Sequence, residues 1–198
     1  MSSNLLSLAI WLPILGAVAV LAMGSERRDA MRWLALAVAV AGFLVTIPLY
    51  TGFDKSQAGM QFVELAPWIP DFRINYFLGV DGISVLFLLL NSFITVLVVL
   101  AGWTVIEEKQ AQYMGAFLVM SGLMNGIFSA LDGILFYVFF EASLIPMYII
   151  IGVWGGPNRV YAAFKFFLYT LLGSLLMLIA LIYLFLASGG SFNLLEWH

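Results

Sequence analysis

Cysteine is absent from this sequence, and its one histidine, His198, is the last residue. Without thiols the chain can form no disulfide, no thiolate zinc site and no cysteine-ligated iron–sulfur cluster. Because no hydrophobic segment contains a histidine, no helix offers an imidazole to haem. Any redox chemistry associated with this chain must therefore take place in a partner.

Charge is also scarce. Asp, Glu, Lys and Arg make up 10% of the 198 residues, whereas soluble domains carry about 25%. Hydrophobic residues make up 64%, and the mean hydropathy is +1.07. This composition indicates an all-α integral membrane protein. The net charge of −3 comes mostly from loops and gives no basis for binding nucleic acid.

Six hydrophobic segments come close to the length of about 20 residues that a helix needs to cross a bilayer. We therefore predict one membrane domain over residues 1–198, a bundle of about six transmembrane helices. We expect the first segment to be retained, because no basic residue precedes it and its apolar run is too long for a signal peptide. The predicted spans are Leu5–Met23, Trp33–Tyr50, Asp81–Trp103, Tyr113–Ala130, Gly133–Gly156 and Val160–Ser188.

A short β-hairpin is predicted in the longest polar interval, between the second and third spans. Its strands are expected at Met60–Leu65 and Arg73–Leu78, around the turn-prone segment Pro67–Asp71. Asp81 follows directly and is suited to cap the third helix, its carboxylate accepting from the amides of the first turn. A role for Asp81 in ion conduction is the alternative. Asp132 is expected to cap the fifth helix in the same way.

The fourth span contains a pair of small residues, Gly122 and Gly126, four positions apart. Such a pair lets another helix approach closely. Asn125 lies between them and can hydrogen-bond across that contact.

Basic residues predict the orientation, because cytoplasmic loops of membrane proteins are enriched in Lys and Arg. The first, third and fifth loops would then be cytoplasmic, and both termini and the hairpin would face outward. The cytoplasmic set is Arg27, Arg28, Arg32, Lys109 and Arg159, whereas the opposite side has Lys55 and Arg73.

The fifth span, GILFYVFFEASLIPMYIIIGVWGG, carries one ionisable residue, Glu141. A carboxylate at that depth costs a few kcal/mol even on lenient insertion scales. Pro146 has no N–H, so the carbonyl of Ala142 loses its helical partner and the nearby backbone becomes locally polar. We interpret Glu141 as a proton-handling group, since intramembrane ionisable residues are usually functional. The alternative is a neutral acid that only hydrogen-bonds to a neighbouring helix.

Lys165 is the second intramembrane charge, in AAFKFFLYT of the sixth span. It lies about 8 Å from the predicted cytoplasmic end, so its side chain could snorkel to the headgroups. The predicted depths of Lys165 and Glu141 differ by about 13 Å, too far for a direct ion pair. A water chain could link them, so Lys165 is either a secondary member of a proton path or a snorkelling residue.

Three segments, LGVDGIS, FYVFFEASLIPMYIIIGVWGG and NRVYAAFKFFLYTLLGSLLML, resemble subunit M of bacterial NADH:quinone oxidoreductase (respiratory complex I). More broadly they resemble the antiporter-like subunits that this complex shares with multisubunit cation/proton antiporters. The resemblance covers nearly the whole chain and is most specific in the fifth and sixth spans. It implies that Glu141 is a key protonatable residue of a proton path and that Lys165 is a less critical one.

The resemblance also implies an organisation. Members of that family have about fourteen helices with two inverted repeats. Residues 1–112 would be the three leading helices, and 113–198 the first three helices of an incomplete five-helix repeat. The family's broken helix with a central lysine would follow residue 198, so we expect this chain to be an N-terminal fragment.

The resemblance implies partners and a location as well. Flavin, iron–sulfur clusters and quinone would be bound by partner subunits, with no cofactor and no metal in this chain. The partners would be other membrane subunits of complex I, above all its neighbouring antiporter-like subunits, in the inner (plasma) membrane. Two alternatives stay open: a subunit of an Mrp-type cation/proton antiporter, and an assembly scaffold without transport activity of its own.

Overall fold

The computed structural model of the chain describes residues 4–24 and 27–197. Two residues of the predicted first loop, 25 and 26, and the single histidine at 198 lie outside that part. The elements are, in order, α1 (Leu5–Met23), α2 (Arg28–Thr51), β1 (Gln61–Ile69), the 3-10 turn η1 (Pro70–Phe72), β2 (Ile74–Val80), α3 (Ser84–Val105), α4 (Gln110–Ser129), α5 (Gly133–Trp154), α6 (Arg159–Ala187) and the 3-10 turn η2 (Leu194–Glu196).

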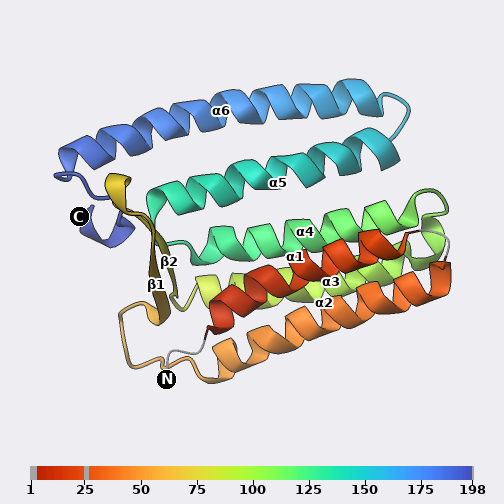
Figure 1. Cartoon of the computed structure of the whole chain (residues 1–198), viewed down its shortest axis with the longest axis horizontal. Helices are drawn as coiled ribbons and strands as arrows, with labels where there is room; N and C mark the ends of the chain where they lie inside the picture. Colours follow the sequence, from red (N-terminus) through yellow and green to blue (C-terminus); the bar gives the residue numbers. More distant parts are fainter. Residues whose placement is uncertain (1–3, 25–26, 198) are drawn as a thin grey trace.

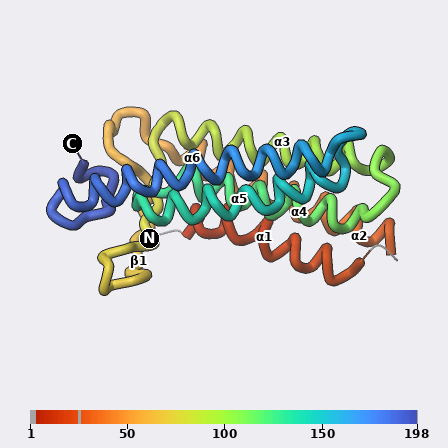
Figure 2. Tube along the Cα trace, turned by 90° about the horizontal axis from the view of Figure 1, so that it is seen from above, coloured from red at the N-terminus to blue at the C-terminus, as the bar shows by residue number. Residues whose placement is uncertain are grey.

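The helices lie side by side along the long axis of the molecule (Figure 1). α1, α2, α3 and α4 pack against one another as a group, α5 packs on α4, and α6 packs on α5 at the edge. The strands and both chain ends lie at one end of the bundle, and the α5–α6 turn lies at the other (Figures 1 and 2). We call these the strand end and the opposite end.

Five helices, α1, α2, α3, α5 and α6, are long and apolar enough to cross a membrane. α4 is also 20 residues long, but polar side chains such as Gln110, Ser121 and Asn125 are buried along it. It contacts α1, α3 and α5, so these polar groups face other helices. Because α4 is not among these five helices, its role as a sixth span stays a prediction.

Small residues on α4 allow the close packing that the sequence predicts. A Cβ at Gly122 would collide with the backbone carbonyl of Ile10 on α1, and one at Gly126 would lie 2.7 Å from the ring of Phe139 on α5. The close approach of other helices at this glycine pair is therefore confirmed.

Several predicted boundaries differ from the structure. α2 begins at Arg28, five positions before the predicted start at Trp33. Its N-terminal part is tied to another helix, because the Nε–H of Arg32 donates to Oε1 of Gln110 at 2.9 Å. α3 begins at Ser84, later than the predicted Asp81.

The antiparallel strands are longer than predicted, and the turn is shifted. Pro67 pairs with Asn75 inside the ladder, which a two-stranded edge tolerates because a proline there need not donate a ladder hydrogen bond. η1 and Arg73, with φ of 56°, make the turn. The prediction that Pro67 is a turn residue and Arg73 a strand residue is therefore wrong.

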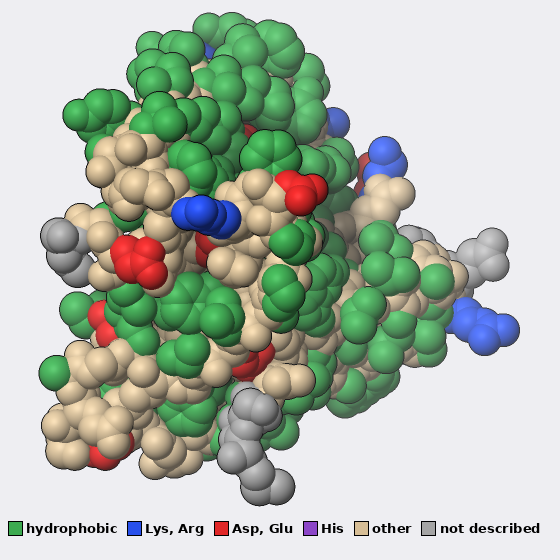
Figure 3. Space-filling model, turned by 60° about the vertical axis from the view of Figure 1, so that its left-hand side comes forward, with side chains coloured by type: hydrophobic (Ala, Val, Ile, Leu, Met, Phe, Trp, Pro, Cys, Tyr) green, Lys and Arg blue, Asp and Glu red, His purple; other side chains and the backbone are tan. Residues whose placement is uncertain are grey.

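The surface at the strand end is mixed. Charged side chains of both signs are scattered among hydrophobic and other polar atoms there (Figure 3). The long sides of the bundle are instead strongly apolar, and on α6 they include exposed Leu172, Ile179 and Tyr183.

Candidate functional site

Glu141 lies about 12 Å along α5 from its first residue, away from both helix ends. Its side chain is partly buried. Its Oε1 atom is fully buried and has no hydrogen-bond partner among the described residues. Buried polar atoms are nearly always hydrogen-bonded, and an exception calls for an explanation such as an unobserved water or a proton.

The neighbours of Glu141 show which way it faces. Tyr137, one turn before it, lies beside both Glu141 and Ser174 of α6. Tyr148, two turns after it, packs against Phe167 of α6 with ring centroids 5.6 Å apart. Positions 137, 141 and 148 share one helical face, so Glu141 is directed toward the α5–α6 contact. Sequence reasoning missed Tyr137 and Ser174, whose role depends on the pairing of two helices.

Pro146 is buried, and α5 continues through it to Trp154. The proline still supplies no N–H to the carbonyl of Ala142. A groove of about 390 Å³ runs over this part of α5 and is lined by Ile145, Pro146 and Ile149 together with residues of α1 and α4. The helix is therefore continuous, with one weakened backbone position directly after Glu141.

Lys165 lies on the outer face of α6 and is exposed. Its Nζ atom lies 5.9 Å from the ring centroid of Tyr161, one turn toward the N-terminus of the helix. This is the direction that a snorkelling side chain would take from here. Among the described residues the one ion pair is Arg32–Asp29, at 3.6 Å, so the structure does not pair Lys165 with Glu141.

Both predicted capping aspartates accept from backbone amides. Asp81 Oδ1 accepts from the amides of Ile83 (3.1 Å) and Ser84 (2.7 Å). The Ser84 amide is the largest cause that lowers the pKa of Asp81. Through these two bonds the carboxylate of Asp81 acts as a cap just before the first residue of α3.

Asp132 is almost completely buried. Its Oδ1 accepts from the amides of Ile134 (2.9 Å) and Leu135 (3.1 Å), and its Oδ2 accepts from the amide of Asn75 on β2 (3.0 Å). Burial raises the pKa of Asp132, and the three amides oppose that rise. Asp132 therefore caps α5, as predicted, and also ties it to the strands.

A polar network in the centre of the α1–α4 group was only partly predicted. Asn125 donates to the carbonyl of Ala9 on α1 at 3.0 Å and accepts from Asn91 of α3 at 2.8 Å. Nearby, Thr95 of α3 donates to Ser121 of α4 at 2.8 Å. Asn125 thus bonds across a helix contact as predicted. The network is internally satisfied, which fits a role in holding helices together.

Glu64 is a long-range cap that sequence reasoning missed. It lies on β1 with 8% exposure, and its Oε1 accepts from the amide of Leu6 at 2.8 Å. The hydroxyl of Ser7 also donates to Glu64 and lies 3.0 Å from the hydroxyl of Tyr76. The carboxylate thus closes the N-terminus of α1.

The chemistry available at the candidate site is that of a single carboxyl group. Across residues 4–24 and 27–197, no group of three or more Asp, Glu, His or Cys side chains could hold a metal ion. The hydroxyl of Tyr137 lies beside Glu141, and the hydroxyl of Ser174 lies beside Tyr137. A carboxyl group with hydroxyl neighbours can accept, hold and release a proton.

Comparisons with known proteins cover most of the chain. Residues 57–129 match the family "NADH-ubiquinone oxidoreductase chain 4, amino terminus". Residues 130–197 match the family "NADH:quinone oxidoreductase/Mrp antiporter, TM".

Individual relatives agree with these families. The chain is 52% identical to NADH-quinone oxidoreductase subunit M of Rhodobacter capsulatus, over 94% of this chain and 36% of that protein. It is 44% identical to NADH-ubiquinone oxidoreductase chain 4 of Arabidopsis thaliana, over 93% of this chain and 37% of that protein. The chain thus spans a little over a third of the length of these relatives.

Solved structures share the fold. A chain of respiratory complex I from Thermus thermophilus with bound NADH superposes with a TM-score of 0.82 at 32% identity, over 97% of this chain and 38% of that chain. A chain of the Mrp complex from Dietzia sp. superposes with a TM-score of 0.78 at 19% identity, over 94% of this chain and 20% of that chain. At that lower identity the likeness concerns the fold alone.

Proposed function

The chain belongs to the family of subunit M and chain 4 of NADH:quinone oxidoreductase, and from this membership we propose that it forms part of a proton-translocating membrane subunit. NADH oxidation and quinone reduction would take place in partner subunits, which would hold the flavin, the iron–sulfur clusters and the quinone. This part would contribute no redox group. It would act with other membrane subunits of complex I, in the inner membrane of a bacterial cell.

The observation that carries this proposal is the buried Oε1 atom of Glu141, which has no hydrogen-bond partner within residues 4–24 and 27–197. A permanently charged carboxylate with one buried oxygen unpartnered is costly inside a membrane, whereas a proton on that oxygen would remove the charge. The approach of a positive charge to Glu141 would favour release of the proton, and the withdrawal of that charge would favour reloading. Glu141 would thus perform the elementary step of a pump, with the hydroxyl of Tyr137 beside it and that of Ser174 beside Tyr137.

The proposed arrangement in the membrane has six spanning helices, α4 included. The Arg and Lys residues of the α1–α2, α3–α4 and α5–α6 connections gather at the opposite end, which would face the cytoplasm. The strand end and both chain ends would then face outward. Residues 1–112 would precede a five-helix repeat of which 113–198 supply the first three helices.

Replacement of Glu141 by glutamine in the complete subunit tests the proposal. Glutamine keeps the shape and much of the hydrogen bonding but cannot ionise, so the complex should assemble while coupled proton transfer is lost. Glu141→Asp keeps the acid and should retain part of the activity. Glu107→Gln is a matched control, because Glu107 is exposed in the α3–α4 loop. Proton pumping in Glu141→Gln vesicles at the rate of the Glu107→Gln control would reject the proposal.

A cation/proton antiporter of the Mrp type is the second candidate, since the family matched by residues 130–197 includes both kinds of protein. The higher identity to subunit M favours the first candidate. Purification of the complete subunit from its native membrane would separate the two. A flavin- and iron–sulfur-containing complex is expected in the first case, and a complex without redox groups in the second.

A further inference from the structure

A polar cavity of about 400 Å³ lies at the opposite end of the bundle, between the α3–α4 loop and the α5–α6 turn. Its lining includes Glu108, Lys109, Val153, Trp154, Arg159 and Val160. The indole N–H of Trp154 donates to the carbonyl of Glu108 at 3.1 Å and ties the two segments together. The cavity therefore has a fixed wall.

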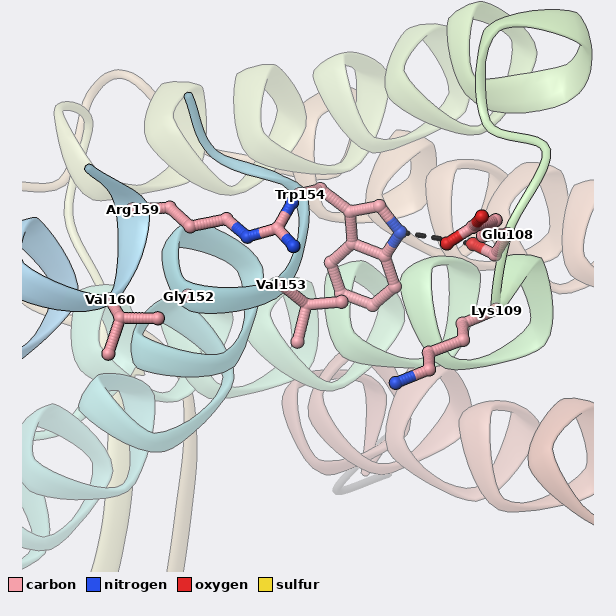
Figure 4. A pocket seen from close by; sticks show the side chains of 7 residues that line it. All are labelled: Glu108, Lys109, Gly152, Val153, Trp154, Arg159 and Val160. Atoms are coloured by element: carbon pink, nitrogen blue, oxygen red, sulfur yellow. Dashed lines mark hydrogen bonds between the residues drawn. The ribbon is translucent and has the colours of Figure 1, made fainter. Parts of the chain in front are cut away.

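Two positive charges border this cavity. The guanidinium of Arg159 and the ammonium of Lys109 approach the Trp154 indole from different sides (Figure 4). Within the described residues neither side chain takes part in an ion pair, since the single pair there is Arg32–Asp29. Glu108 supplies one negative charge to the lining, so one positive charge remains in excess.

An apolar groove lies further along α5, toward the middle of the bundle. Val153 of α5 lines the polar cavity, and Ile149 and Ile145 line the groove of about 390 Å³ shared with Leu21 of α1 and Ala116 of α4. Spacings of four residues place Val153, Ile149 and Ile145 on one face of α5. That face runs about 12 Å from the polar cavity into the hydrophobic part of the bundle.

We propose that these two cavities form one binding site for an anionic phospholipid. The phosphate would lie between Lys109 and Arg159, and an acyl chain would follow Ile149 and Ile145 into the groove. Basic pockets at the ends of transmembrane helices bind anionic headgroups, and tryptophan is enriched at the depth of the headgroups. A free phosphate ion would satisfy the cations but would leave the groove unused, so charge and shape together favour the lipid.

Native mass spectrometry of the full 198-residue chain in detergent tests the site. Palmitoyl-oleoyl phosphatidylglycerol is the probe, and phosphatidylcholine with the same acyl chains is the zwitterionic comparison. Each basic residue beside an anionic lipid is worth about fivefold in binding. We therefore expect one tightly retained phosphatidylglycerol and a loss of about tenfold or more in affinity for the double variant Lys109→Gln/Arg159→Gln.

The matched control is Arg27→Gln/Arg28→Gln, which removes two arginines at the start of α2 that line neither cavity. It should leave binding nearly unchanged. A second pair tests the groove with all cations intact: Ala116→Trp fills it and should weaken binding, whereas Ile179→Trp, on the exposed face of α6 outside both cavities, should not.

Three results would overturn the proposal. The first is an equal loss of phosphatidylglycerol in both double variants, and the second is equal binding of phosphatidylcholine. The third is displacement of the lipid by millimolar inorganic phosphate, which would assign the cations to a free anion. If the Lys109→Gln/Arg159→Gln variant fails to fold, the Ala116→Trp and Ile179→Trp pair decides: equal binding by the two rejects the site.

Discussion

Replacement of Asp132 by alanine should lower the free energy of unfolding by about 1.5–5 kcal/mol. The loss of an N-cap costs about 0.5–2 kcal/mol. The same change leaves the amide of Asn75 without its acceptor, and an unsatisfied buried donor costs about 1–3 kcal/mol. Both terms apply in full, because Asp132 is 1% exposed and water has little access.

The variant Asp132→Asn separates the cost of losing the N-cap from the cost of leaving the Asn75 amide without an acceptor. Asp132→Asn keeps one oxygen to cap Ile134 and Leu135 but presents an NH₂ group to the amide of Asn75, so it should lose only the second term, about 1–3 kcal/mol. Equilibrium unfolding of the detergent-solubilised chain, followed by circular dichroism, measures both variants. Asp71→Ala is the control, since Asp71 is an exposed acid of η1 at the same end. Equal stability of Asp132→Ala and Asp71→Ala would refute this reasoning.

The same residue predicts a dependence on pH. Burial raises the pKa of Asp132 above its ordinary value of 3.8, so the folded chain holds this proton to a higher pH than the unfolded chain does. The contribution of Asp132 to stability should therefore fall as the pH rises from about 4 through its folded pKa. The difference in stability between wild type and Asp132→Asn isolates that contribution. A difference that grows over this range would contradict the sign.

Three further predictions concern packing, topology and charge. Gly126→Ala should destabilise the chain by about 1–3 kcal/mol through overpacking against Phe139, and a smaller side chain at Phe139 should restore part of the loss in the same unfolding measurement. A cysteine at Ser56 should react with an impermeant thiol reagent added outside intact cells, and one at Glu107 should not; the reverse pattern would invert the proposed orientation. Lys165→Arg should keep proton pumping and Lys165→Ala should lower it only in part, whereas complete loss in an assembled Lys165→Arg complex would assign its ammonium a specific role.

Features that depend on a short stretch of sequence could be predicted. Asp132 stands directly before a hydrophobic run, and a carboxylate in that place can hardly avoid the amides of the first helical turn. Gly122 and Gly126 are four positions apart, so they form one smooth patch on a helix. Glu141 is recognisable because one acid stands in an otherwise apolar span.

Features that depend on tertiary contacts could not be predicted. The charges of Arg28 and Arg32 favour a loop. α2 nevertheless includes both residues, because Arg32 donates a hydrogen bond to Gln110 on another helix. Pro67 favours a turn by its chemistry, yet a two-stranded edge accommodates it. The hydroxyl of Ser174 comes beside Tyr137 only because α5 and α6 pair in one particular register.

The cap that Glu64 places on α1 has a consequence for biogenesis. Leu6 and the carboxylate that binds its amide are 58 residues apart. When α1 leaves the ribosome, β1 has not yet been synthesised, so the first amides of the helix must be hydrated. The N-terminus of α1 can reach its final place only after α2 has been inserted and β1 has emerged beyond it. The smallest unit that can complete this end of the protein is therefore the segment from α1 through β1, and a ribosome-bound chain truncated before Glu64 should leave the start of α1 open to water.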